Sequence, residues 1–199
     1  MKLIRSAVLV LVLAPFTLAS GTDDLLQYDD GTADWFTFEG EYRGTWFNLE
    51  DFYPAVDASG LVLNYAEIWF FHVYTHPWDS SDFTGEITDG TPESPGTVFA
   101  HDTGTAVHLS ASYIYPLAPC TTGTDFTVTE IPEFSVFGAP SIASDVSPAT
   151  NPRSFTVTSG MINYWQYDFL VRVNGYPLPP AGLARTTWAS LKATFNCMR

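Results

Sequence analysis

Turn-forming residues interrupt this chain so often that long helices have little room to form. The sequence holds 14 glycines and 14 prolines. Together with Asp-Gly pairs and Ser/Thr clusters they recur about every 10–15 residues, a spacing typical of short strands joined by turns. No long stretch shows helical periodicity. We therefore expect an all-β chain whose strands form two packed antiparallel sheets.

The segments between these turns give the candidate strands. The run at 68–71 is apolar on both faces, which predicts a central strand buried from both sides and places Trp69 in the core. Residues 125–130 read D-F-T-V-T-E, which predicts one buried face and one wet face. Turn formers at 89–96 predict a loop between two strands. The expected strands are 35–38, 41–49, 61–74, 84–88, 97–101, 106–116, 125–130, 134–137, 141–146, 154–158, 162–165 and 168–173.

The N-terminus predicts export. Residues 1–20 carry Lys2 and Arg5, then an apolar run, then small residues around Ala19. This pattern is typical of a secretory signal. The apolar run is too short for a membrane span, which needs about 20 apolar residues. An uncleaved N-terminal anchor is the alternative. We expect an extracellular, cell-surface or periplasmic protein with no membrane segment after signal removal, and a sandwich domain over residues 21–178.

The remaining residues, 179–199, are expected to form a tail packed on or tethered to the domain. Export makes a disulfide between Cys120 and Cys197 the favoured state of the two cysteines, and two unrelated thiols the alternative. Residues 185–196 fit either a short helix or a last strand, since their apolar residues satisfy both patterns.

The charge of the chain excludes one class of partner. The formal net charge is −14 at pH 7, and Lys192 is the lysine that remains after signal removal. A nucleic-acid binder needs basic residues that face phosphates, so no nucleic-acid partner is expected. The acids are scattered rather than gathered in runs, which suits solubility and the protection of sheet edges.

Four short segments carry a family resemblance. Their order and spacing resemble those of a secreted bacterial β-sandwich module, which occurs attached to exported enzymes and surface proteins or alone. The resemblance implies a jelly-roll-like sandwich with an accessory or surface role, and it implies no catalytic residues. The segments are Y-D-D-G-T-A-D at 28–34, S-P-G-T-V at 94–98, D-F-T-V at 125–128 and D-F-L-V-R at 168–172.

Asp29 and Asp30, just before Gly31, form the sharpest local feature. Their hard oxygens suit Ca²⁺, which makes them candidate calcium ligands. The alternative is a turn in which each Asp accepts hydrogen bonds from its own backbone and the glycine supplies a positive φ. A calcium site would also need acids from distant loops. The candidates are Asp79, Asp82, Asp145 and Asp168.

Catalytic motifs find little support. His72 and His76 are four residues apart, and on a strand this separates them by about 13 Å, too far to share a zinc ion. The chain lacks the G-x-S-x-G of a nucleophile elbow. A pair of carboxylates for glycoside hydrolysis remains open among 22 acids.

The aromatic residues suggest a platform for sugar rings, with core packing as the alternative. Trp78 lies in a proline-held loop with Asp79 and Asp82, and we take these three as the candidate ligand-binding residues. The other aromatics considered are Trp46, Trp69, Trp165, Tyr28, Tyr74 and Tyr164.

These observations predict an exported, non-catalytic β-sandwich with a binding or surface-structural role, whose partner is an extracellular glycan or another surface protein. The alternatives are a secreted polysaccharide hydrolase and a calcium-stabilised adhesion or assembly subunit.

Overall fold

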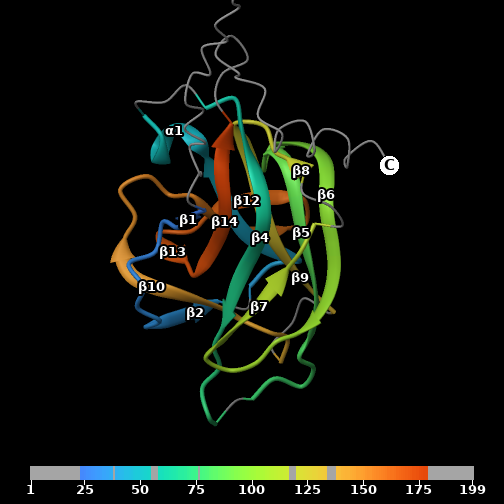
Figure 1. Ribbon diagram of the computed structural model, residues 1–199. Helices are drawn as coiled ribbons and strands as arrows, with labels where there is room; N and C mark the ends of the chain where they lie inside the picture. Colours follow the sequence, from blue (N-terminus) through green and yellow to red (C-terminus); the bar gives the residue numbers. More distant parts are fainter. Residues whose placement is uncertain are drawn as a thin grey trace, which may run out of the picture.

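The computed structural model describes residues 23–37, 39–54, 58–75, 77–116, 120–133 and 138–178. Within these residues two antiparallel sheets pack face to face, so the predicted two-sheet sandwich is confirmed (Figure 1). The predicted signal segment, the tail from 179, the strand at 134–137, His76 and Cys197 lie outside the described residues. The disulfide of Cys120 therefore stays a prediction.

The first sheet has eight strands. Its main path runs β1-β14-β4-β10-β13, while β2 pairs with β10, and β7 and β8 pair with β4. These strands are β1 (Asp24–Leu26), β2 (Trp35–Thr37), β4 (Gly60–Phe70), β7 (Ser110–Ile114), β8 (Cys120–Thr121), β10 (Ile142–Pro148), β13 (Tyr167–Phe169) and β14 (Val171–Leu178).

The second sheet has six strands in the order β12-β11-β3-β9-β5-β6. One short helix, α1 (Leu49–Phe52), follows β3, and no helix in the described residues is long and apolar enough to cross a membrane. The strands are β3 (Tyr42–Asn48), β5 (Asp82–Thr91), β6 (Ser94–Thr105), β9 (Asp125–Pro132), β11 (Ser154–Thr158) and β12 (Met161–Tyr164).

The core fills the space between the sheets with alternate residues of each strand. Phe47 of β3 and Phe126 of β9 are fully buried and stack with ring centres 5.2 Å apart. On β4, Ile68 and Phe70 point into this core and are fully buried. Trp69 lies between them and therefore faces the opposite side of the sheet, where it is only partly buried. The expectation that Trp69 belongs to the core is wrong.

Two predicted connections also differ. The predicted loop at 89–96 is a tight hairpin, because β5 continues to Thr91 and β6 begins at Ser94. The predicted strand at 168–173 is interrupted at Leu170, and its two parts pair with different strands: β13 with β10, and β14 with β4. The break places Asp168 and Arg172 on separate strands.

Candidate functional site

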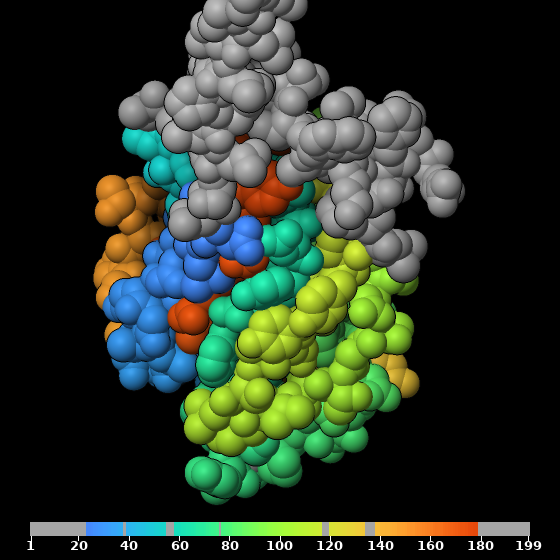
Figure 2. All heavy atoms as spheres, viewed as in Figure 1, coloured from blue at the N-terminus to red at the C-terminus, as the bar shows by residue number. Residues whose placement is uncertain are grey.

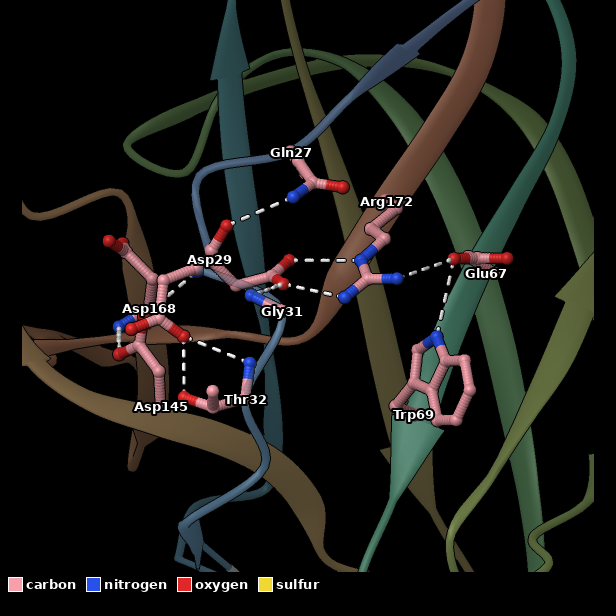
Figure 3. A network of polar contacts seen from close by, with 10 residues as sticks. Gln27, Asp29, Gly31, Thr32, Glu67, Trp69, Asp145, Asp168 and Arg172 are labelled. Atoms are coloured by element: carbon pink, nitrogen blue, oxygen red, sulfur yellow. Dashed lines mark hydrogen bonds and ion pairs between the residues drawn. The ribbon is translucent and has the colours of Figure 1, made fainter.

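A network of polar side chains joins the loop after β1 to the outer face of the first sheet (Figure 3). The strand order β1-β14-β4-β10-β13 makes this possible, since it sets side by side segments that are far apart in the sequence. Asp29 and Asp30 follow β1, Asp145 lies in β10, Asp168 in β13 and Arg172 in β14. We call Asp29, Asp30, Asp145 and Asp168 the carboxylate cluster.

Asp145 ties the cluster together. One of its carboxylate oxygens accepts the backbone N–H of Asp30 at 3.3 Å, and the other accepts the backbone N–H of Asp168 at 3.1 Å. The residue is buried. Of the four distant acids considered as partners for Asp29 and Asp30, the structure therefore brings two, Asp145 and Asp168, to the predicted pair.

The turn after β1 is an Asx turn, as in the alternative that the sequence offered to a calcium site. The N–H of Gly31 donates to the Asp29 carboxylate at 3.0 Å, and the N–H of Thr32 donates to the Asp30 carboxylate at 2.9 Å. Gly31 has a φ of 87°, as predicted for a turn of this kind. The Asx turn orients both aspartates toward β10 and β14, where Ser147 also donates to Asp30.

Asp168 is the member of the cluster with an open acceptor. It is 8% exposed, and its Oδ1 is buried with no hydrogen-bond partner in the described structure. Burial raises the pKa of this carboxyl to about 6, and the charges of Asp145, Asp29 and Asp30 act in the same direction. Among the described residues, no three His, Cys, Asp or Glu side chains surround a common point as metal ligands would.

Arg172 connects the carboxylate cluster to β4. Its guanidinium makes two bonds to Asp29, from Nε at 3.2 Å and from Nη2 at 2.7 Å, and its Nη1 lies 3.5 Å from Glu67. The guanidinium carbon also lies 5.6 Å from the ring centre of Trp69, whose indole N–H donates to Glu67 at 3.2 Å. The guanidinium of Arg172 thus pairs with two carboxylates and lies near an aromatic ring.

Next to this network lies a group of tyrosines on the same outer face. Glu67 of β4 is the register partner of Tyr113 of β7, so alternate residues of the two strands share this face. Tyr65 packs edge-on against Tyr113 at 5.4 Å, and Tyr113 stacks on Tyr115 at 6.3 Å. Tyr113 is 49% and Tyr115 57% exposed. We call Tyr65, Tyr113 and Tyr115 the tyrosine face.

Figure 2 views the molecule from this side, with β1, β14, β4 and β7 next to one another. Asn174 of β14 is the register partner of Tyr65 and accepts a hydrogen bond from Asn64 at 2.8 Å. The tyrosine face is thus bordered by amide, carboxylate and guanidinium groups. These tyrosines are not among the residues predicted from the sequence, although the alternation of residues 113 and 115 with buried Ile114 is a usable signal.

Trp78, the favoured aromatic of the predicted binding loop, is only partly exposed. Its ring packs edge-on against Phe70 and His72, and its indole N–H donates to Ser141 at 3.0 Å. Asp79 and Asp82 are exposed. Trp78 therefore packs at the edge of the core and is less exposed than the sequence suggested.

The other aromatics considered have separate positions. The ring of Trp46 lies 4.0 Å below the guanidinium of Arg153, and Trp165 packs against the core. Tyr74 is 88% exposed, but it lies beyond the end of β4 and beside His108. Tyr28 packs against Phe47, and Tyr164 donates to Glu93 at 2.5 Å, which joins β12 to the β5–β6 hairpin.

The outer face of the second sheet holds a groove of about 400 Å³ between that hairpin and the sheet. Thr127 and Thr129, expected on a wet face of β9, line it and are nonetheless mostly buried. The tip of the hairpin shields them, since Pro92 and Pro95 line the other side of the groove. This groove lacks the exposed aromatic rings of the tyrosine face.

No protein-family model matches the chain, and comparisons with curated proteins and with solved structures also find no similar protein. Function is therefore inferred from the chain's own residues.

Proposed function

We propose that this protein is an exported, non-catalytic β-sandwich that binds glycans on the outer face of its first sheet. The observation that supports this best is the tyrosine face, where two exposed rings, Tyr113 and Tyr115, stand beside the polar groups of Glu67, Asn174 and Arg172.

The chemistry of a sugar ring suits such a surface. The flat C–H faces of a sugar pack on aromatic rings, and its hydroxyls need hydrogen-bonding groups at the edge of the rings. Tyr113 and Tyr115 remain 49% and 57% exposed although they contact each other, so each keeps ring surface that a unit of an extended glycan can contact. The rings stand on or next to a strand, which limits the entropy lost on binding.

The arrangement of Glu67 favours binding over hydrolysis. A glycosidase needs two carboxyl groups that flank the scissile bond and are free to exchange protons. Glu67 is instead engaged by the indole of Trp69 and the guanidinium of Arg172. We assign it to the positioning of its neighbours.

Export and the Cys120–Cys197 disulfide belong to the same proposal, because a disulfide that fixes the tail persists in an oxidising compartment. Sequencing of the secreted protein's N-terminus tests the signal at residues 1–20. Intact mass before and after reduction tests the disulfide, which predicts a gain of two hydrogens. An unprocessed N-terminus or an unchanged mass contradicts the corresponding part.

The binding proposal is tested with a glycan array and pull-down on insoluble polysaccharides, performed in EDTA. The double variant Tyr113→Ala/Tyr115→Ala should lose affinity by about tenfold or more, since each aromatic contact contributes roughly 1 kcal/mol. Tyr74→Ala is the control, because Tyr74 is even more exposed, at 88%, and lies outside the tyrosine face. Trp78→Ala tests the loop predicted from the sequence.

Retention of a glycan by the wild type and Tyr74→Ala, with loss in the double variant, supports the proposal. Equal retention by all variants, or retention lost only in Trp78→Ala, removes the tyrosine face as the site. Failure of the wild type to retain any glycan contradicts glycan binding itself.

A further inference from the structure

The carboxylate cluster concentrates negative charge that the cations among the described residues do not balance. Asp29, Asp145 and Asp168 are 4%, 1% and 8% exposed, and Asp30 lies beside them at the surface. Within the described residues, the ion pairs that reach this cluster come from Arg172 alone. Both bonds of that guanidinium to the cluster go to Asp29, and its remaining nitrogen faces Glu67.

Among the described residues, no cation pairs with the other three carboxylates, Asp30, Asp145 and Asp168. Backbone and hydroxyl donors satisfy most of their oxygens: Asp145 takes two backbone N–H groups, and Asp30 takes Thr32 and Ser147. Such bonds lower the cost of burying charge but do not neutralise it.

Asp168 lacks even these donors at one oxygen. Its Oδ1 is buried and has no hydrogen-bond partner among the described residues, and the backbone N–H of Asp168 donates to the carboxylate of Asp145. A buried carboxylate oxygen with no donor is rare in folded proteins, and it calls for an unseen partner. Figure 3 shows Asp168 beside Asp145, at the end of the network away from Glu67.

We propose that one Ca²⁺ ion binds at the carboxylate cluster, with Asp168, Asp145 and Asp30 as its carboxylate ligands and with Asp29 held beside them by Arg172. The donors are hard oxygens from a turn and two strands. Ca²⁺ accepts six to eight such ligands, including water and backbone carbonyls, in irregular geometry, whereas Mg²⁺ demands a near-ideal octahedron.

Binding requires a change of side-chain positions, because the three carboxylates do not converge on one point among the described residues. Asp30 is the member that can move, because its side chain is exposed. In this structure the hydroxyls of Thr32 and Ser147 donate to it. Asp145 and Asp168 are fixed by burial and provide the rigid half of the site. The proposed ligands include no residue of the tyrosine face, so calcium binding and glycan binding are tested separately.

The experiment uses the whole secreted protein, stripped with EDTA, and CaCl₂ as the probe. Calorimetric titration should show binding at one site per chain, and the Tm should rise with Ca²⁺ by mass action and much less with MgCl₂. Asp168→Asn removes the unpaired charge without changing shape. It should fold without calcium, weaken Ca²⁺ affinity by about tenfold or more, and lose the rise in Tm.

Two further variants keep the proposal falsifiable. Asp30→Asn changes an exposed ligand and should also weaken Ca²⁺ affinity, even if Asp168→Asn fails to fold. Asp82→Asn is the matched control, an exposed aspartate on β5 outside the cluster, and should behave as the wild type. A wild-type Tm and calorimetric trace unchanged by millimolar Ca²⁺ would overturn the proposal, as would Asp168→Asn and Asp30→Asn variants that both bind Ca²⁺ like the wild type. The first result would assign the open oxygen of Asp168 to a proton.

Discussion

Asp29 and Arg172 form a two-pronged ion pair that links positions 143 residues apart. The pair fastens the turn after β1 to β14 and, through Glu67 and Trp69, joins the carboxylate cluster to the outer face of the first sheet. The Asp29 side chain is fully buried and that of Arg172 is 14% exposed. Arg172 thus contacts both the carboxylate cluster and Glu67, which borders the tyrosine face.

Removal of Arg172 should destabilise the fold strongly. Arg172→Met leaves the buried carboxylate of Asp29 without its cation, and breaking a buried pair in this way costs about 3–5 kcal/mol in the free energy of unfolding. Arg172→Lys should lose less, because it keeps the charge but not the two-pronged geometry. Urea denaturation in EDTA measures both variants. Equal stability of Arg172→Met and wild type would show that the pair contributes nothing net.

A second ion pair lies between the sheets and makes a separate test. Arg43 of β3 and Glu130 of β9 are register partners, and both side chains are fully buried. Glu130→Gln should destabilise the protein by about 3–5 kcal/mol, since it leaves the guanidinium partly unpaired. The double variant Arg43→Met/Glu130→Leu should recover much of this loss, because it removes both charges together. A double variant that is less stable than Glu130→Gln in urea contradicts this expectation.

The sandwich could be predicted because strand and turn signals are local. The strand expected at 154–158 appears with the same bounds as β11. The Asp29-Asp30-Gly31 turn was also among the predicted alternatives, since an Asx turn needs only neighbouring residues.

The contents of the two sites could not be predicted because they depend on pairing between distant strands. Asp145 and Asp168 reach Asp29 only through the sheet order, and nothing local separated them from Asp79 and Asp82. The tyrosine face needs the β4–β7 register, and a shift between Asn174 and Gly175 of β14 accompanies the change of inward face on β4. A slip of one residue would turn Tyr65 into the core.

The pair of His72 and His108 gives a pH-dependent prediction. The backbone N–H of His72 donates to Nδ1 of His108 at 3.1 Å, and the two ring centres are 4.2 Å apart. Burial lowers the pKa of His108 below its usual 6.5, and His72 acts in the same direction. Because the pKa is lower in the folded state, the stability due to neutral His108 is complete above 6.5 and is lost as pH falls through the folded-state pKa.

An NMR titration of the imidazole protons measures this pKa directly. His108 should titrate below 6.5, and His72→Gln should move its pKa upward by the part of the shift that His72 causes. His101→Gln and His76→Gln assign the signals of the other two histidines. A pKa of 6.5 or above for His108 in the wild type contradicts the prediction.

Two glycines with the same backbone conformation allow the cost of a positive φ to be measured apart from the cost of a steric clash. Gly31 has a φ of 87° and Gly90 a φ of 88°. A Cβ at Gly31 would meet no atom within 4 Å, whereas at Gly90 it would lie 2.3 Å from the carbonyl oxygen of Ser94 across the β5–β6 hairpin. Gly31→Ala should therefore cost about 1–2 kcal/mol, the cost of a left-handed conformation alone. Gly90→Ala should cost more, because the hairpin backbone must also shift. Urea denaturation of both variants in EDTA gives the difference, and equal or reversed losses would show that the hairpin turn accommodates the added methyl group.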